Sequence, residues 1–149
     1  MRGREHERLN IFVGRWHTEG KITAPGEPAA RIDSQDVYEW LPGQYFVVHR
    51  WDSRIGDDTA AGIEILSVDR GTGNYCTHFF DNGGNAGSEQ LTVLENTWTW
   101  LGKDVMGAKW HRCISVLSDD GRTMTARHER SENGDTWSPW MDVTLRRID

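Results

Sequence analysis

From Arg15 onward, apolar and aromatic residues occur in short runs that are divided by turn signals. Runs of this length, rich in aromatic and β-branched residues, are typical of strands. They predict strands near 15–23, 32–41, 44–53, 60–69, 74–81, 86–94, 96–102, 107–118, 122–131 and 136–147. Only Glu5 to Val13 has helical spacing, with Leu9 and Phe12 on one face, and Gly14 would end this short helix.

The turn signals between the strands predict how the strands connect. The dividers are Pro42-Gly43, Gly71-Thr72-Gly73, Asn82-Gly83-Gly84, Asp120-Gly121 and Asn133-Gly134. Evenly spaced strands joined by tight turns form an antiparallel meander, and about ten of them are expected to curl and close, which removes exposed edges. We therefore expect an all-β chain that folds as one domain over residues 1–149, a meander barrel of about ten strands with a short N-terminal helix.

The last two turns also predict which side chains face the interior. An Asp-Gly or Asn-Gly pair favours a two-residue type I′ turn, which fixes the register of its hairpin. Asp120-Gly121 then pairs Cys113 with His128, and Asn133-Gly134 pairs His128 with Pro139. Both hairpins place Met124, Ala126 and His128 on the less charged face, so His128 is predicted to point inward.

The stretch "YEWLPGQYFVVHRWD", Tyr38 to Asp52, gives a similar result. An even loop around Pro42-Gly43 pairs Asp36 with His49 and puts the aromatic residues on the same face. In the next hairpin, closed as Asp69–Asn74, His78 and Phe80 share a face with Ile63 and Ile65, and Glu64 lies on the opposite face. We predict that both the aromatic face and the His78 face point inward.

A barrel of this size is wider than its side chains can fill, so an internal cavity is expected. An apolar chamber with a few polar groups is the usual form of a small-molecule site. Its predicted ligand-binding residues are Tyr38, Trp40, Tyr45, His49, Trp51, His78, Phe80, His128 and Met141, with Asp36 and His111 as further polar groups. The alternative is that these aromatic residues serve only as core packing.

Composition and charge narrow the partners. The chain has 149 residues, and its 17 basic and 23 acidic residues give a net charge of −6 without a basic run. This balance disfavours nucleic acid and anionic membranes as partners. We see no signal-peptide core and no run that could span a bilayer, and two cysteines fit a reduced cytoplasmic chain better than a disulfide scaffold. Eight tryptophans and sixteen glycines agree with an all-β fold.

Two candidate chemistries arise from the predicted interior. In one, His49 acts as a base oriented by Asp36, as an isomerase or cyclase would require; the alternative is a structural cross-strand hydrogen bond. In the other, His128 ligates haem or a metal; the alternative is a satisfied histidine beside the buried Cys113 thiol. No His-x-His or paired-cysteine spacing is present, so we predict no metal, and no Gly-x-Ser-x-Gly supports a hydrolase.

Short motifs resemble those of known families. Gly14-Arg15-Trp16 and the closing Arg146-Arg147 resemble the Gly-x-Trp and terminal Arg of the lipocalin-like, or calycin, superfamily. This resemblance implies that Trp16 lies at the closed end of the barrel with Arg147 stacked over it. "YEWLPGQYFVVHRWD", "IEILSVDRGTGNYCTHFFDNGGNAG" and "WSPWMDVTLRR" resemble a bacterial domain family of unknown function with a lipocalin-like barrel.

The chain is also similar, more distantly, to the haem-binding nitrobindins and their Gly-x-Trp-x-Gly-x-Gly opening. Thr18 replaces the middle glycine here, and residues 136–149 lack the histidine that ligates haem on the final strand of nitrobindin. Haem would then depend on His128, one strand earlier.

The sequence thus predicts a cytoplasmic barrel, a monomer or homodimer, that binds a small hydrophobic molecule and has no cofactor. The alternatives are an isomerase or cyclase that uses His49 with Asp36, and haem binding through His128.

Overall fold

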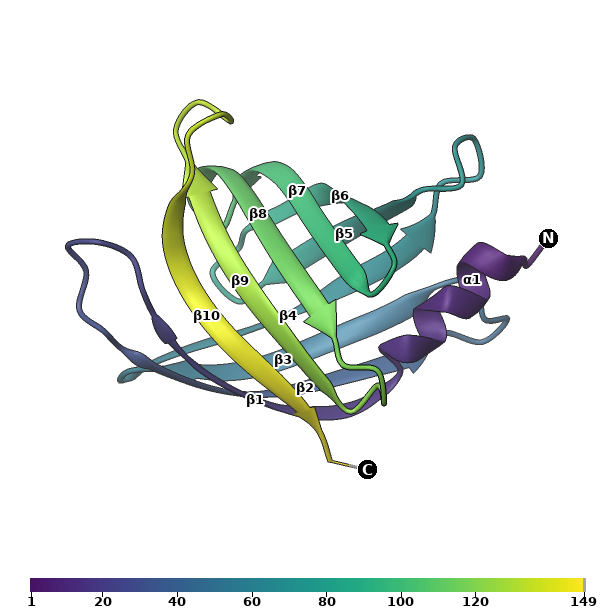
Figure 1. Cartoon of the computed structure of the whole chain (residues 1–149), viewed down its shortest axis with the longest axis horizontal. Coiled ribbons are helices and arrows are strands. Elements are labelled where there is room, and N and C mark those ends of the chain that lie inside the picture. The colour runs from purple at the N-terminus through teal and green to yellow at the C-terminus, as the bar shows by residue number, and fades with distance from the viewer. Residues whose placement is uncertain (149) are drawn as a thin grey trace.

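The computed structural model describes residues 1–148 and shows a closed barrel of ten antiparallel strands (Figure 1). A short helix, α1 (Arg4–Arg8), continues into a 3-10 turn over Leu9–Ile11. The strands are β1 (Gly14–Ile22), β2 (Arg31–Trp40), β3 (Val47–Ile55), β4 (Asp58–Val68), β5 (Tyr75–Asp81), β6 (Ala86–Leu94), β7 (Thr97–Val105), β8 (Ala108–Leu117), β9 (Thr123–Ser131) and β10 (Ser138–Arg147). The predicted fold class is confirmed.

The barrel is a meander in which each strand pairs with its neighbours along the chain. The exception is the seam, where β1 pairs with β10 and closes the barrel. In Figure 1 the purple β1 and the yellow β10 lie side by side. Closure leaves no strand edge unpaired, as expected for so many consecutive strands.

One end of the barrel is filled by apolar side chains beneath the N-terminal segment. Leu9, Phe12 and Trp16 are fully buried and pack with residues of most strands. The indole N–H of Trp16 donates to the Phe12 carbonyl at 2.8 Å. The Arg147 guanidinium lies 4.2 Å from the centre of the Trp16 ring and donates to the Val13 carbonyl. The N-terminal segment therefore plugs this end, and Arg147 stacks on Trp16 as the calycin resemblance implies.

Of the predicted β2–β3, β8–β9 and β9–β10 registers, one is correct, and the other two differ from the observed pairing by two residues. The β8–β9 pairing is as predicted, with Cys113 opposite His128. The β9–β10 loop is longer than a two-residue turn, and a bulge between Pro139 and Met141 restores the phase, so His128 faces Met141 instead of Pro139. In β2–β3, His49 faces Tyr38 instead of Asp36. Beyond the bulge both shifts are two residues, which leaves those side chains on their predicted faces, whereas Pro139 lies opposite Glu129 on the outer face.

The face predicted for β4 and β5 is wrong. Ile65 pairs with His78 and Asp69 closes on Asn74 as expected, so the register itself is confirmed. However, Glu64 and Phe79 are buried inside, whereas His78 and Phe80 are exposed on the outer face. A register fixes which residues share a face, but a face with isoleucines can still be the outer one when the opposite face has more apolar area.

Glycines facing the interior let aromatic rings lie against the strand backbone. A Cβ on Gly87 would lie 2.9 Å from the Phe79 ring, and one on Gly62 would lie 2.5 Å from the Trp51 ring. Both distances are too short for any side chain, so these two rings occupy the space that a side chain would take. A side chain at position 62 or 87 would therefore have to displace a ring that lines the cavity.

Candidate ligand-binding site inside the barrel

The half of the barrel opposite the Trp16 end holds a cavity of about 220 Å3. Apolar side chains form most of its wall, and Ile55, Ala60 and Met106 extend it towards the β3–β4 and β7–β8 turns. The other apolar lining residues are Ile32, Tyr38, Trp51, Phe79, Trp100, Val105, Met124, Ala126, Met141, Val143 and Leu145. Met106 lines the cavity and is 37% exposed, so the cavity lies close to the surface at this end.

The structure brings together five of the predicted ligand-binding residues. The cavity is lined by Tyr38, His49, Trp51, His128 and Met141. The inward orientation predicted for these residues is confirmed, and their contact with a ligand stays a prediction.

Two further residues predicted for the cavity lie elsewhere. Trp40 lies at the plugged end, where its indole N–H donates to Asn10 Oδ1 at 2.8 Å. Tyr45 precedes β3 and packs edge-on against the His6 ring. Both rings cover the N-terminal segment, and neither is among the residues that line the cavity. His78 and Phe80 lie outside the barrel, as described above.

A first set of polar side chains, the His49 network, crosses the interior. Thr18 Oγ1 donates to Asp36 Oδ2 at 2.6 Å, and His49 Nε2–H donates to Asp36 Oδ1 at 2.6 Å. His49 Nδ1–H donates to Glu64 Oε1 at 3.1 Å, and Trp100 Nε1–H donates to Glu64 Oε2 at 3.0 Å. Because β4 and β7 are not neighbours in the barrel, the Glu64–Trp100 bond spans its inside.

The His49 network holds a protonated imidazole. Burial disfavours the charged ring, but the hydrogen bonds and charges of Asp36 and Glu64 outweigh it and raise the pKa of His49 to about 9. The His49 hydrogen bond lowers the pKa of Asp36 despite burial. The Tyr38 ring stacks on the imidazole at 4.0 Å between centres and 5° between planes, a geometry that suits a cation. At neutral pH the three groups together carry one net negative charge.

A second set, the His128 network, lines the opposite wall. Its members are consecutive hydrogen-bond partners: Glu89, His111, His128, Cys113 and Ser115. Glu89 Oε2 lies 2.9 Å from His111 Nδ1, and His111 Nε2 lies 2.9 Å from His128 Nδ1. The Cys113 sulfur lies 3.6 Å from His128 Nε2, a weaker contact.

Burial keeps the His128 network uncharged. Desolvation, with the nearby charge of Glu64, raises the pKa of Glu89 to about 8, and desolvation lowers the pKa of His111 to about 4 and that of His128 to about 3. Burial also raises the pKa of Cys113 to about 12. At neutral pH the Glu89 carboxylic acid therefore donates to His111 Nδ1, which sets both rings as Nε2–H tautomers that donate onward towards Cys113.

Both networks depend on residues that sequence reasoning missed. Glu64 was assigned to the outer face, and Glu89 and Trp100 were not considered as interior groups. A signal for Glu89 was available, since it lies two positions from Leu91, which is fully buried, and so shares its face. Trp100 is paired opposite Leu91, which places it inside as well.

These pKa shifts predict a stability maximum near pH 6.5. His49 and Glu89 have folded pKa values above their unfolded ones, so their contribution falls as pH rises, for His49 between about 6.5 and 9 and for Glu89 up to about 8. His111 and His128 have lowered values, so stability also falls as pH drops below 6.5. His49 alone accounts for about 3 kcal/mol of the alkaline loss.

Urea unfolding at pH 5, 6.5 and 9 measures this profile. In His49→Gln, where that titration is absent, the alkaline decline is expected to become shallower. A wild-type free energy of unfolding that increases from pH 6.5 to 9 would contradict the assignment.

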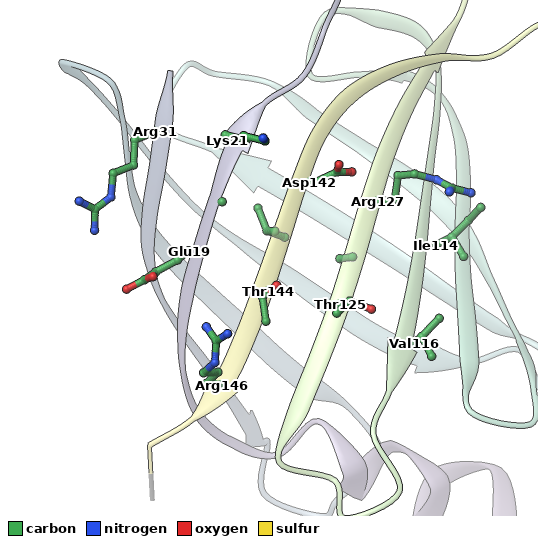
Figure 2. Close-up of a pocket in the computed structure, with 13 residues that line it drawn as sticks. Glu19, Lys21, Arg31, Ile114, Val116, Thr125, Arg127, Asp142, Thr144 and Arg146 are labelled. Atoms are coloured by element: carbon green, nitrogen blue, oxygen red, sulfur yellow. The ribbon is translucent and has the colours of Figure 1, made fainter. Parts of the chain in front are cut away.

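The outer surface has features of its own. A shallow hollow of about 840 Å3 lies on β1, β8, β9 and β10, with both charge signs along its sides (Figure 2). Ala126 and Val143 line both this hollow and the cavity. Within the described residues, His17, Glu19 and Asp33 form the one group of three potential metal ligands, and they lie half-exposed on the outer face with His17 already paired to both carboxylates. Neither feature contacts the two buried networks.

Among residues 1–148, we find no helix with the length and hydropathy required to cross a membrane.

Comparisons with known proteins identify a family and a shared fold. The sequence profile of the family described as "Protein of unknown function (DUF1579)" matches residues 2–147. Among curated proteins, none matches the chain. The barrel is similar to the crystal structure of Rv2717c from M. tuberculosis, with a TM-score of 0.73 and 13% identity over 99% of both chains. It is also similar to the S-type phycobiliprotein lyase CPES from Guillardia theta, with a TM-score of 0.70, 9% identity, and 99% of this chain and 94% of that chain covered.

Proposed function

The chain belongs to the DUF1579 family, whose function is unknown, and we propose that its barrel binds a small, mostly apolar molecule in the interior cavity. The observation that carries this proposal is the division of the barrel into a filled end and an open chamber. Among residues 1–148, one continuous core cluster of fifteen buried residues includes five that line the chamber, Tyr38, Trp100, Met124, Ala126 and Leu145, whereas Phe12, Trp16 and Trp98 fill the plugged end. The chamber beyond them has an apolar wall interrupted by oriented polar groups, which is the general form of a ligand site.

The dimensions of the chamber limit the ligand. About 220 Å3 lies below the roughly 300–1,000 Å3 that is common for ligand pockets. The ligand is therefore either small or projects past Met106. One protein of similar fold is named as a phycobiliprotein lyase. This name supports our proposal that the barrel binds another molecule.

Filling the chamber should abolish binding. Ala126 is buried and lines the cavity, so Ala126→Leu is expected to weaken binding of 2-phenylethanol by about tenfold or more. The binding is measured by quenching of tryptophan fluorescence, because Trp51 and Trp100 line the cavity.

Thr125→Leu is the matched control. Thr125 is the adjacent residue and is exposed on the outer face, so this variant adds apolar volume without entering the chamber. Equal affinity for 2-phenylethanol in Ala126→Leu and wild type would remove the interior as the binding site.

An isomerase or cyclase is a second candidate because a charged acid group faces the chamber. His49 is buried and held between two carboxylates, Asp36 and Glu64, at a fixed orientation. With a pKa near 9, it is poised to donate a proton at neutral pH and would not act as the general base first expected. Both N–H groups of His49 already donate to these carboxylates, so a substrate would have to displace one of them to accept a proton from His49.

Haem binding through His128 has less support. Both ring nitrogens of His128 already have partners, His111 on one side and Cys113 on the other. An iron atom would have to displace one of them, and a cavity of about 220 Å3 is small for a macrocycle. The residues present therefore do not fit this cofactor.

A further inference from the structure

The acidic groups of the chamber specify the charge of its ligand. Resting on the proposed function, we propose that the preferred ligand carries a protonated amine, and that this ammonium group binds between Glu64 and Glu89 against the aromatic wall. The inference adds a chemical class to the small apolar molecule proposed above. It stands on the identity, burial and hydrogen bonds of the side chains that line the chamber.

Carboxyl groups outnumber cationic groups in the wall of the chamber. Three carboxyl groups line the chamber, those of Asp36, Glu64 and Glu89, and each side chain is almost completely buried. Among the described residues that line the chamber, none is lysine or arginine, and His49 is the one side chain that bears a positive charge. The chamber thus has more acidic than basic groups, in a medium where charges interact strongly.

The strongest hydrogen-bond donors of the His49 network already have partners. Both N–H groups of His49 donate to carboxylates, and the Trp100 N–H donates to Glu64. A ligand carboxylate would therefore meet the negative network with its strongest donors already in use. A ligand ammonium would instead meet carboxylate oxygens that have lone pairs left, since each oxygen can accept more than one hydrogen bond.

Aromatic side chains line the chamber together with these carboxyl groups. Trp51, Phe79 and Trp100 line the chamber together with Glu64 and Glu89. Aromatic faces attract ammonium groups, most strongly when the pair is desolvated. The hydrocarbon part of an apolar amine can thus pack on these rings while its ammonium group contacts the carboxyl groups.

Glu89 gives the proposal a measurable consequence. Without a cation its carboxyl group is neutral at pH 7, held so by burial and by the charge of Glu64. An ammonium group beside it favours the carboxylate, so one proton leaves the network to solvent. His111 then donates from Nδ1 to Glu89, and His128 shifts to its Nδ1–H tautomer and donates to His111 Nε2. The other charged and titratable groups around Glu64 and Glu89 are Asp36, Tyr38, His49, His111, Cys113 and His128. Of these, Asp36 and His49 keep their charges at pH 7.

Three probes with the same hydrocarbon test the charge preference: 2-phenylethylamine, 2-phenylethanol and phenylacetate. Isothermal titration at pH 7 is expected to show the amine binding about tenfold or more tightly than the alcohol, and phenylacetate binding weakest. In two buffers of different ionisation enthalpy, amine binding is expected to release up to one proton, whereas the alcohol releases none.

Glu89→Gln connects the preference to this residue. The amide replaces the neutral acid with nearly the same shape, and it cannot ionise, so proton release is expected to vanish and the amine-to-alcohol affinity ratio to fall at least about threefold. Glu19→Gln, on the outer face, removes a carboxylate without touching the chamber and should leave both quantities as in wild type.

Failure of this proposal is distinguishable from failure of the proposed function. If the alcohol binds as tightly as the amine, or phenylacetate binds best, the charge preference is wrong while the chamber remains a ligand site. If none of the three probes binds, both proposals fall.

Discussion

Replacement of Asp36 by alanine is expected to lower the free energy of unfolding by about 3–5 kcal/mol at pH 7. The carboxylate accepts hydrogen bonds from His49 and from Thr18, both at 2.6 Å, and it is 6% exposed. Without it, the imidazolium of His49 remains buried with Glu64 as its one charged partner. A buried ion that loses a partner keeps the cost of its desolvation, and the alternative of losing its proton also costs free energy.

Guanidinium unfolding monitored by tryptophan fluorescence measures this change. Asp33→Ala is the control, because Asp33 lies on the same strand, 42% exposed on the outer face, and an exposed pair contributes about 1 kcal/mol or less. The difference between wild type and Asp36→Ala should shrink at pH 10, where His49 is neutral. A loss below 1 kcal/mol at pH 7, or one that is independent of pH, would show that the His49 network is not charged as described.

Replacement of Trp16 by alanine is expected to cost about 3–5 kcal/mol as well, for a different reason. The Trp16 ring is fully buried at the plugged end, beneath Arg147 and beside the N-terminal segment. Alanine would leave a large void there, free the Phe12 carbonyl from its donor and remove the surface on which Arg147 stacks.

Two other tryptophan variants separate these contributions. Trp16→Phe keeps most of the ring volume but loses the hydrogen bond, so an intermediate loss is expected. Trp137→Ala removes a partly exposed ring whose principal contact is the Arg112 guanidinium, and it is expected to cost about 1 kcal/mol or less. If Trp16→Ala and Trp137→Ala were equally stable in thermal unfolding, the plugged end would not be the main core.

The fold was predictable because the turns and the side-chain period constrain it independently. Asp120-Gly121 predicted the β8–β9 register correctly, although the turn is not the expected two-residue type I′ turn. Gly121 has positive φ but Asp120 does not, and the Gly121 N–H donates to the Ser118 carbonyl. The loops at Pro42-Gly43 and Asn133-Gly134 are longer than predicted. Each displaced its register by two residues, and a displacement of two leaves the faces unchanged. The inward orientation predicted for His49 and His128 is therefore correct even though the lengths of the two loops were not.

The site was less predictable because its decisive contacts join strands that are distant in the sheet. Glu64 lies inside since Trp100, on a strand that is not its neighbour, donates to it across the barrel. A hairpin register relates only two neighbouring strands, so it cannot predict a contact between β4 and β7 across the barrel. His78 and Phe80 were predicted to face inward because they share a face with Ile63 and Ile65. With Glu64 assigned to the opposite face, Asp36 was the one carboxylate expected beside His49, and His49 was predicted to act as a base.

The meander topology has a consequence for how the barrel forms during synthesis. All pairings except one join strands that are adjacent in the chain, so successive hairpins can form with short loop closures as each strand is made. The seam is different, because it joins β1, the first strand, to β10, the last, and includes the Trp16–Arg147 stack. A nascent chain can therefore assemble a curved sheet strand by strand, but the barrel and its chamber close only after β10 has left the ribosome.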